Sequence, residues 1–309
     1  LRAVATLTAA AAIVAGCRNL KATNALTTPW NFRYAEPWQV LNAVTYLLNF
    51  AAVRVPGRLD GRQWSQDAAT QQRYFAPAGW AFAIWAPIFA GELLFVIYQA
   101  LPLARVRTSW WLAELSPYFS GAMLLQTLWC GAFRPWARAA GLNLQWIPAL
   151  LLGLGAAALG GAHGILVQAL EDSELSPLSY ALAFVPLALH FGWLTAAALV
   201  NANGFVAAAA PRSHAVKASA AIASIYLAVL VGAAVTFARR DPIYAAVIAW
   251  ALAAIADEAA WGKLRGQVDE TVLQIQRLTA KGGSRAMLAV AAAPLAAQAL
   301  RVGGALLRR

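Results

Sequence analysis

Long, continuous apolar segments alternate with short polar segments along most of this chain. Each long segment has close to the roughly 20 residues that an α-helix needs to cross the hydrocarbon core of a membrane. Apolar residues follow one another without the alternation that a strand of a membrane β-barrel would show. The pattern therefore predicts an all-α polytopic membrane protein. Its expected membrane helices are residues 38–53, 78–100, 116–133, 142–162, 178–200, 215–237 and 242–262.

The N-terminal region, residues 1–37, carries a shorter apolar run at residues 3–17. Arg2 and Arg18 flank this run, which is short for a membrane-spanning helix. A short apolar core beside basic residues is typical of signal and organellar targeting segments. We therefore expect residues 1–37 to form a targeting-like or interfacial segment.

The C-terminal region, residues 263–309, has a different pattern from the membrane helices. Residues 263–280 place four apolar side chains on one helical face, which predicts an amphipathic surface helix: Val268, Val272, Ile275 and Leu278. Beyond Gly282-Gly283, residues 285–307 are rich in Ala and Leu but also hold Pro294, Gln298 and Arg301. This second part predicts an interfacial helix, with an eighth membrane span as the alternative.

Composition supports a membrane protein and adds an orientation. Of the 309 residues, 61% are hydrophobic and 12% are charged, which excludes a disordered chain and disfavours a soluble enzyme. The net charge of +11 comes mainly from one set of loops, which includes loop 54–76 and the C-terminus. The positive-inside rule places these parts on the cytoplasmic, stromal or matrix side. No basic segment alternates with aromatic residues, so we expect no nucleic-acid partner.

Two ionisable residues inside expected spans are candidates for chemistry, because such residues are costly in hydrocarbon. Glu92 lies in the second span and His190 in the fifth. Either side chain is a tentative axial ligand for the metal of a haem or chlorophyll. The alternatives are a protonated Glu bonded to a neighbouring helix and a hydrogen-bonded packing His. No paired-His metal motif, phosphate loop or nucleophile elbow occurs, so we expect no catalytic site and no other metal site.

Aromatic and amide residues recur at helical spacing in three of the expected spans. Some of the 13 Trp residues fall near span ends, where membrane-interface Trp is common. Others share one helical face with small or amide residues, a combination that suits a flat hydrophobic ligand. A packed interior would give the same spacing and stays open as the alternative. The residues concerned are Pro77, Gly79, Phe82 and Trp85; Gln126 and Trp129; and Trp193, Ala197 and Asn201.

At these positions the sequence resembles the tryptophan-rich sensory protein/translocator protein (TspO/MBR) family. The resemblance covers residues 38–203 and implies a five-helix TspO-like bundle, with Gln126 in place of the family's Asn. Residues 204–262 would then add two further transmembrane helices. The family is linked to binding of porphyrins, haem and sterols, so loop 54–76 is expected to close a ligand pocket. The expected lining is Trp38, Trp64, Phe82, Trp85, Gln126, Trp129 and Trp193.

The resemblance implies a non-catalytic membrane protein that binds a hydrophobic small molecule in a Trp-lined pocket. Candidate ligands are a tetrapyrrole (porphyrin, haem or chlorophyll), a carotenoid or a sterol, with membrane lipid as the surrounding partner. The alternative is a structural accessory subunit of a large photosynthetic or respiratory membrane complex, carrying pigment and contacting other subunits. The candidate membranes are the plastid thylakoid, a mitochondrial membrane and a bacterial inner membrane.

Overall fold

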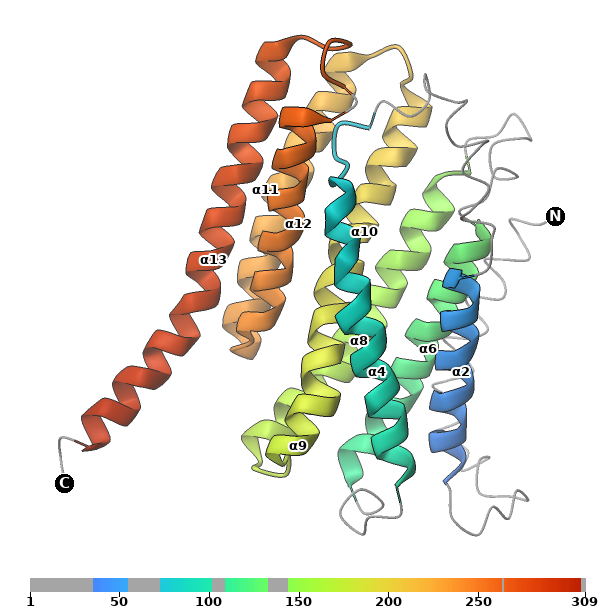
Figure 1. The fold of residues 1–309 in the computed structure, drawn as a ribbon, viewed down its shortest axis with the longest axis vertical. Coiled ribbons are helices and arrows are strands. Elements are labelled where there is room, and N and C mark those ends of the chain that lie inside the picture. Colours follow the sequence, from blue (N-terminus) through green and yellow to red (C-terminus); the bar gives the residue numbers. More distant parts are fainter. Residues whose placement is uncertain (1–35, 55–72, 102–108, 133–143, 263, 307–309) are drawn as a thin grey trace. The chain divides into compact units, whose positions relative to one another are not determined.

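The computed structural model describes residues 36–54, 73–101, 109–132, 144–262 and 264–306 (Figure 1). Across these residues the regular secondary structure is entirely helical, which confirms the all-α expectation. The expected N-terminal segment and most of loop 54–76 lie outside the described residues. The helices are α2 (Pro37–Arg54), η3 (Gly79–Ile84), α4 (Trp85–Ala100), α6 (Trp110–Ala132), α8 (Trp146–Glu171), α9 (Pro177–Ser179), η4 (Tyr180–Phe184), α10 (Val185–Ala209), α11 (His214–Arg239), α12 (Pro242–Trp261) and α13 (Glu270–Leu306).

Five of the helical segments in the described residues are long and apolar enough to cross a membrane. They are Gly79–Ala100, Trp146–Glu171, Pro177–Ala209, His214–Arg239 and Pro242–Trp261. The other two expected spans, residues 38–53 and 116–133, also form helices, α2 and α6, but carry more polar residues. The arrangement is that of an integral, multi-pass membrane protein in a lipid environment.

The chain divides into two compact units, which are described separately. The first unit holds residues 1–68 and 84–194, so it includes α2, α4, α6, α8, α9, η4 and the first part of α10. The second unit holds residues 69–83 and 195–309, so it includes the rest of α10 together with α11, α12 and α13. The domain ranges expected from the sequence stay predictions.

In the first unit, α6 packs against both α2 and α8. Glycines on α8 allow the neighbouring helices to come close, because an added Cβ would meet their side chains. At Gly161 this atom would lie 2.6 Å from the Tyr118 ring, and at Gly160 it would lie 3.1 Å from the Phe191 ring. At Gly155 it would lie 3.1 Å from Leu194 Cδ1. These glycines therefore serve packing within the chain.

A buried polar network joins α2 to α4 and α6 and explains why α2 and α6 are less apolar. Asn42 Nδ2 donates to Gln99 Oε1 and to Ser116 Oγ, both at 2.8 Å. Ser120 Oγ donates to Asn42 Oδ1, also at 2.8 Å. Gln39 Nε2 donates to the Gln99 carbonyl oxygen, and Gln99 Nε2 donates to the Gln39 carbonyl oxygen at 3.1 Å. Polar groups that satisfy one another in this way can be buried at little cost.

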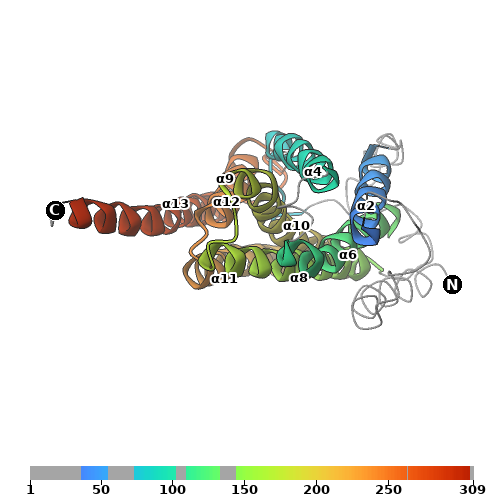
Figure 2. The ribbon, with the colours of Figure 1, turned by 90° about the horizontal axis from the view of Figure 1, so that it is seen from below.

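In the second unit, α13 packs against α12 and α11, and its C-terminal part extends beyond them (Figures 1 and 2). The expectation of two separate C-terminal helices is wrong, because α13 is one helix that continues through Gly282-Gly283. An added Cβ at Gly283 would lie 3.1 Å from Val229 Cγ2 and 3.2 Å from Leu252 Cδ1. The glycine therefore allows close packing of α13 instead of ending a helix.

The face of α13 that packs against α11 and α12 is not the apolar face named in the sequence analysis. Ile275 and Leu278, which the sequence analysis placed on the apolar face, are 54% and 58% exposed. The buried residues lie on the neighbouring face at spacings of three and four residues: Leu273, Gln276, Ala280, Ser284 and Met287. Both faces carry apolar residues, so hydrophobicity alone did not decide between them. The small residues Ala280, Gly283 and Ser284 allow the closer approach to α11 and α12.

Residues 73–83 run along α12 in the second unit and are held there by three hydrogen bonds. Ala78 N donates to the Ala254 carbonyl oxygen, and Trp250 Nε1 donates to the Ala81 carbonyl oxygen, both at 3.0 Å. Trp80 Nε1 donates to Asp257 Oδ2 at 3.0 Å, and the Trp80 and Trp250 rings meet edge to face. The segment that follows loop 54–76 is therefore fixed to the second unit.

Candidate functional site

The first unit buries two ionisable side chains against each other. Glu92 on α4 and His190 on α10 are both completely buried, and Glu92 Oε1 lies 2.6 Å from His190 Nδ1. Within the described part of the chain, Glu92 Oε2 and His190 Nε2 have no hydrogen-bond partner. The structure therefore brings together the two residues that the sequence analysis named separately as tentative axial ligands.

A glycine and a proline bring α4 and α10 together beside this pair. An added Cβ at Gly91 would lie 2.6 Å from Pro186 Cγ, so only glycine fits between the two backbones. Pro186 has no N–H and cannot make the usual helical hydrogen bond. The π-helical turn η4 ends two residues before it, at Phe184, and adjusts the helix to this missing bond. Gly91 precedes Glu92, and Pro186 lies one turn before His190.

An aromatic cluster centred on Trp85 lies beside His190. The Trp85 ring meets the His190 ring edge to face, with centroids 5.6 Å apart and an interplanar angle of 76°. It also meets the Trp193 ring at 6.0 Å and 85°, and it stacks on Phe89 at 5.2 Å and 20°. Among the described residues, the Trp85 indole nitrogen has no hydrogen-bond partner. The sequence analysis missed Phe89, although it lies one helical turn after Trp85.

Gln126 is a second buried polar side chain of the first unit. It is buried on α6, and neither amide atom has a hydrogen-bond partner in the described ranges. Its neighbour Leu125 lies close to Gly155 on α8, at the point where Leu194 on α10 also meets that glycine. Helices α6, α8 and α10 therefore converge at the level of Gln126. An uncharged amide with both donors and an acceptor unused is suited to a polar ligand group.

The other described residues of the expected site are divided between the two units. Trp129 is buried on α6 and Trp38 is half-buried on α2, whereas Trp64 lies outside the described residues. Phe82 is 43% exposed on the 3-10 helix η3. Asn201 Nδ2 donates to the Ala197 carbonyl oxygen at 2.8 Å within α10. The second unit holds Pro77, Gly79, Phe82, Ala197 and Asn201.

The polar groups that the structure describes in the first unit do not form a free-standing metal site. Across the described residues, no group of three or more His, Cys, Asp or Glu side chains is placed to hold an ion. The Glu92–His190 pair can supply a single imidazole nitrogen, because Glu92 already contacts the other one. A single imidazole ligand suits a metal whose other ligands come from a macrocycle.

Comparison with known proteins identifies a family. The family model described as TSPO-like protein matches residues 39–273, well over half of the chain. The match includes α11 and α12 and reaches the beginning of α13. No curated protein and no solved structure matches the chain.

Proposed function

Because the chain belongs to the TSPO-like protein family, we propose that it binds a flat hydrophobic ligand of the tetrapyrrole class at the Glu92–His190 pair and its aromatic neighbours. The role is binding, and no catalytic group is assigned. Trp85 and Trp193 offer aromatic surfaces for the ring system. Gln126 offers an amide for a polar substituent of the ligand.

One observation carries this proposal. His190 Nε2 is completely buried and, in the described part of the chain, has no hydrogen-bond partner, while Nδ1 lies 2.6 Å from a carboxylate oxygen. Histidines that ligate metals are commonly arranged in this way, because a carboxylate on one ring nitrogen orients the other. A polar atom left unsatisfied in hydrocarbon costs free energy, so a bound metal at this nitrogen would remove the cost. The residues present therefore fit a metallated tetrapyrrole with His190 as axial ligand.

Absorption spectroscopy of the purified protein in detergent tests the axial ligand. Iron protoporphyrin IX and metal-free protoporphyrin IX are titrated separately, and the Soret band is followed. We expect His190→Ala to weaken iron protoporphyrin binding by roughly tenfold or more, as loss of a metal contact does. His163→Ala is the matched control, because His163 is also completely buried in the first unit. Equal spectra for His190→Ala and the wild type would refute the assignment.

Fluorescence tests the aromatic part of the site. A bound porphyrin quenches nearby Trp residues, so we expect the double variant Trp85→Ala, Trp193→Ala to lose most of the quenching. Trp111→Ala is the control, since Trp111 is buried on α6 outside the named cluster. Quenching that stays unchanged in the double variant would contradict a porphyrin at this site. If the wild type bound a carotenoid or a sterol but no porphyrin, that class of ligand would replace the proposed tetrapyrrole.

A further inference from the structure

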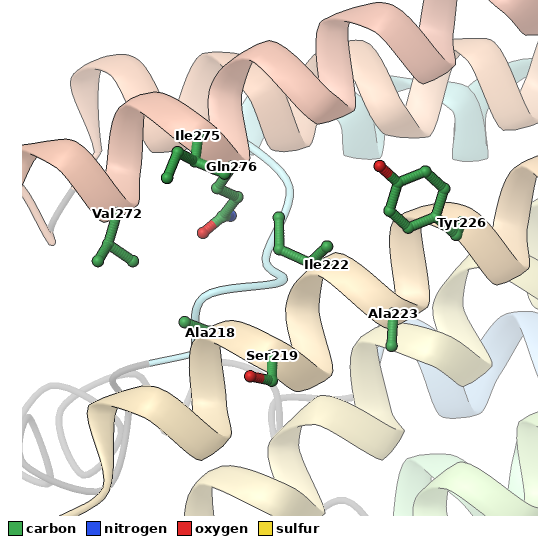
Figure 3. Close-up of a pocket in the computed structure, with 8 residues that line it drawn as sticks. All are labelled: Ala218, Ser219, Ile222, Ala223, Tyr226, Val272, Ile275 and Gln276. Atoms are coloured by element: carbon green, nitrogen blue, oxygen red, sulfur yellow. The ribbon is translucent and has the colours of Figure 1, made fainter.

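The second unit contains a cleft that the proposed ligand site does not use. It lies between α11 and α13 and has a volume of about 430 Å³ (Figure 3). Small-molecule sites in proteins span roughly 300–1,000 Å³, so the cleft is large enough for a ligand. Its walls are mainly aliphatic, with Ile222 on α11 and Val272 and Ile275 on α13.

A buried amide provides the polar feature of this cleft. Gln276 lines it and is only 2% exposed. Its Nε2 donates to the Tyr74 carbonyl oxygen, which fixes the orientation of the amide. Its Oε1 has no hydrogen-bond partner within the described residues. Oε1 can only accept a hydrogen bond, so the group that satisfies it must carry an O–H or N–H donor.

The shape of the cleft favours a chain over a broad ring system. On α11 the lining residues Ala218, Ile222 and Tyr226 follow one another at four-residue spacing, along a single helical face. At 1.5 Å per residue this face extends for about 12 Å along the helix axis. Figure 3 shows these side chains in a row beneath α13, with the Gln276 amide between the two helices.

We propose that this cleft binds a single-chain amphiphile that carries a hydroxyl group, such as a monoacylglycerol or a long-chain alcohol. Its hydroxyl donates to Gln276 Oε1, and its apolar chain lies along Ile222, Tyr226 and Ile275. The side chains of Tyr226 and Ile275 are more than half exposed and are free to adjust around the chain. A phosphatidylcholine has only acceptors in its head group and cannot satisfy Oε1.

Binding of two matched probes tests the hydroxyl requirement. The protein in nanodiscs of phosphatidylcholine is titrated with 1-monolauroylglycerol and with its diacetylated form, which lacks hydroxyl donors, and bound probe is counted by native mass spectrometry. We expect the wild type to prefer the hydroxyl probe by about tenfold, the typical effect of leaving a buried acceptor unpaired. Equal affinities for the two probes would overturn the proposal.

Four variants test whether the probes bind in this cleft. Gln276→Leu should abolish the preference between probes, whereas Gln274→Leu, an exposed control on the same helix, should keep it. Ala223→Phe should weaken both probes by filling the cleft, and its exposed position on α11 makes the substitution compatible with folding. His190→Ala should leave probe binding unchanged, because His190 belongs to the other unit. Wild-type affinities in Ala223→Phe, or a retained preference in Gln276→Leu, would overturn the proposal.

Discussion

Glu92 and His190 are 98 residues apart in the chain, yet their side chains meet at 2.6 Å. Both side chains are completely buried, so water cannot replace either partner in this contact. Hydrogen bonds to a carboxylate are stronger than those between neutral groups. If one partner is removed, the other stays buried without a hydrogen bond, which costs its full desolvation free energy. The contact between these two residues of the proposed ligand site therefore depends on how α4 packs against α10.

The first prediction separates the hydrogen bond from the charge of Glu92. Glu92→Leu removes the hydrogen-bond partner of His190 Nδ1 and leaves that nitrogen buried without one, so we expect a loss of roughly 1–3 kcal/mol in stability. Glu92→Gln keeps an acceptor oxygen and should lose less. Thermal unfolding in detergent, followed by circular dichroism, measures both variants. Equal losses in the two variants would show that an amide cannot replace the carboxyl group, so that an acceptor oxygen alone does not account for the stabilisation.

The second prediction concerns the close approach of α4 and α10 at Gly91. Gly91→Ala places a methyl group 2.6 Å from Pro186 Cγ, and a rigid proline ring cannot turn away. We expect this substitution to lower the unfolding temperature and to weaken porphyrin binding, because it separates Glu92 from His190.

Gly153→Ala is the matched control for Gly91→Ala. An added Cβ at Gly153 meets no atom within 4 Å, and alanine favours a helix over glycine by about 1 kcal/mol. The control should therefore be neutral or stabilising. Porphyrin affinity that is the same in Gly91→Ala and the wild type would argue against the role of this approach.

Hydrophobic pattern predicted most of the helices of this protein, because membrane helices must bury long apolar segments in lipid. It predicted α11 and α12 closely. The same pattern was wrong for the C-terminal region, where Gly282-Gly283 looked like a break. The reason is physical, since a glycine inside a helix either ends it or allows a neighbour to pack closely, and only the tertiary contacts of Gly283 distinguish these outcomes.

The candidate site was predictable only in part. Glu92 and His190 stood out because ionisable groups are rare in hydrocarbon, but nothing in the sequence indicated that they contact each other. Spacing along one helix placed Phe82 with Trp85, and a 3-10 helix also keeps side chains three residues apart on one side. The spacing gave no sign that Phe82 would be exposed while Trp85 packs on His190. Contacts between helices, such as Gly91 against Pro186, depend on the packing of the whole unit.

The third prediction concerns the polar network around Asn42. Asn42→Leu removes a residue that donates to Gln99 and Ser116 and accepts from Ser120. These groups then lack partners in a buried setting, at a cost of roughly 1–3 kcal/mol each where no other partner is found. We expect α2 to pack loosely on α4 and α6 and to become sensitive to a protease. Leu47→Ala, on the exposed face of α2, is the control and should leave proteolysis unchanged.

The fourth prediction addresses the alternative role as a subunit of a larger complex. Small residues of α8 such as Gly153, Gly155, Gly160 and Gly161 could let a foreign helix approach closely. Gly155, Gly160 and Gly161 are covered by side chains of the chain itself, whereas an added Cβ at Gly153 meets no atom within 4 Å. We therefore expect the protein extracted in mild detergent to migrate on a native gel as a free monomer or dimer. Co-migration with a large complex, retained after a second gel dimension in stronger detergent, would favour the subunit role.

The fifth prediction concerns the start of α13, beside the cleft. Asp269 Oδ1 accepts from the Thr271 backbone N–H at 2.6 Å, and this bond and the Thr271 side chain hold the pKa of the carboxyl below its usual 3.8. A lowered folded pKa means that the stabilisation is present above the unfolded value and is lost as the pH falls through the folded one. We expect the amides of Thr271 and Val272 to lose protection from hydrogen exchange, relative to the rest of α13, as the pH falls below the usual carboxyl pKa of 3.8. Asp269→Asn caps a helix without titrating, so its relative protection should not change over this range. The same acid-induced loss in Asp269→Asn would assign the effect to another group.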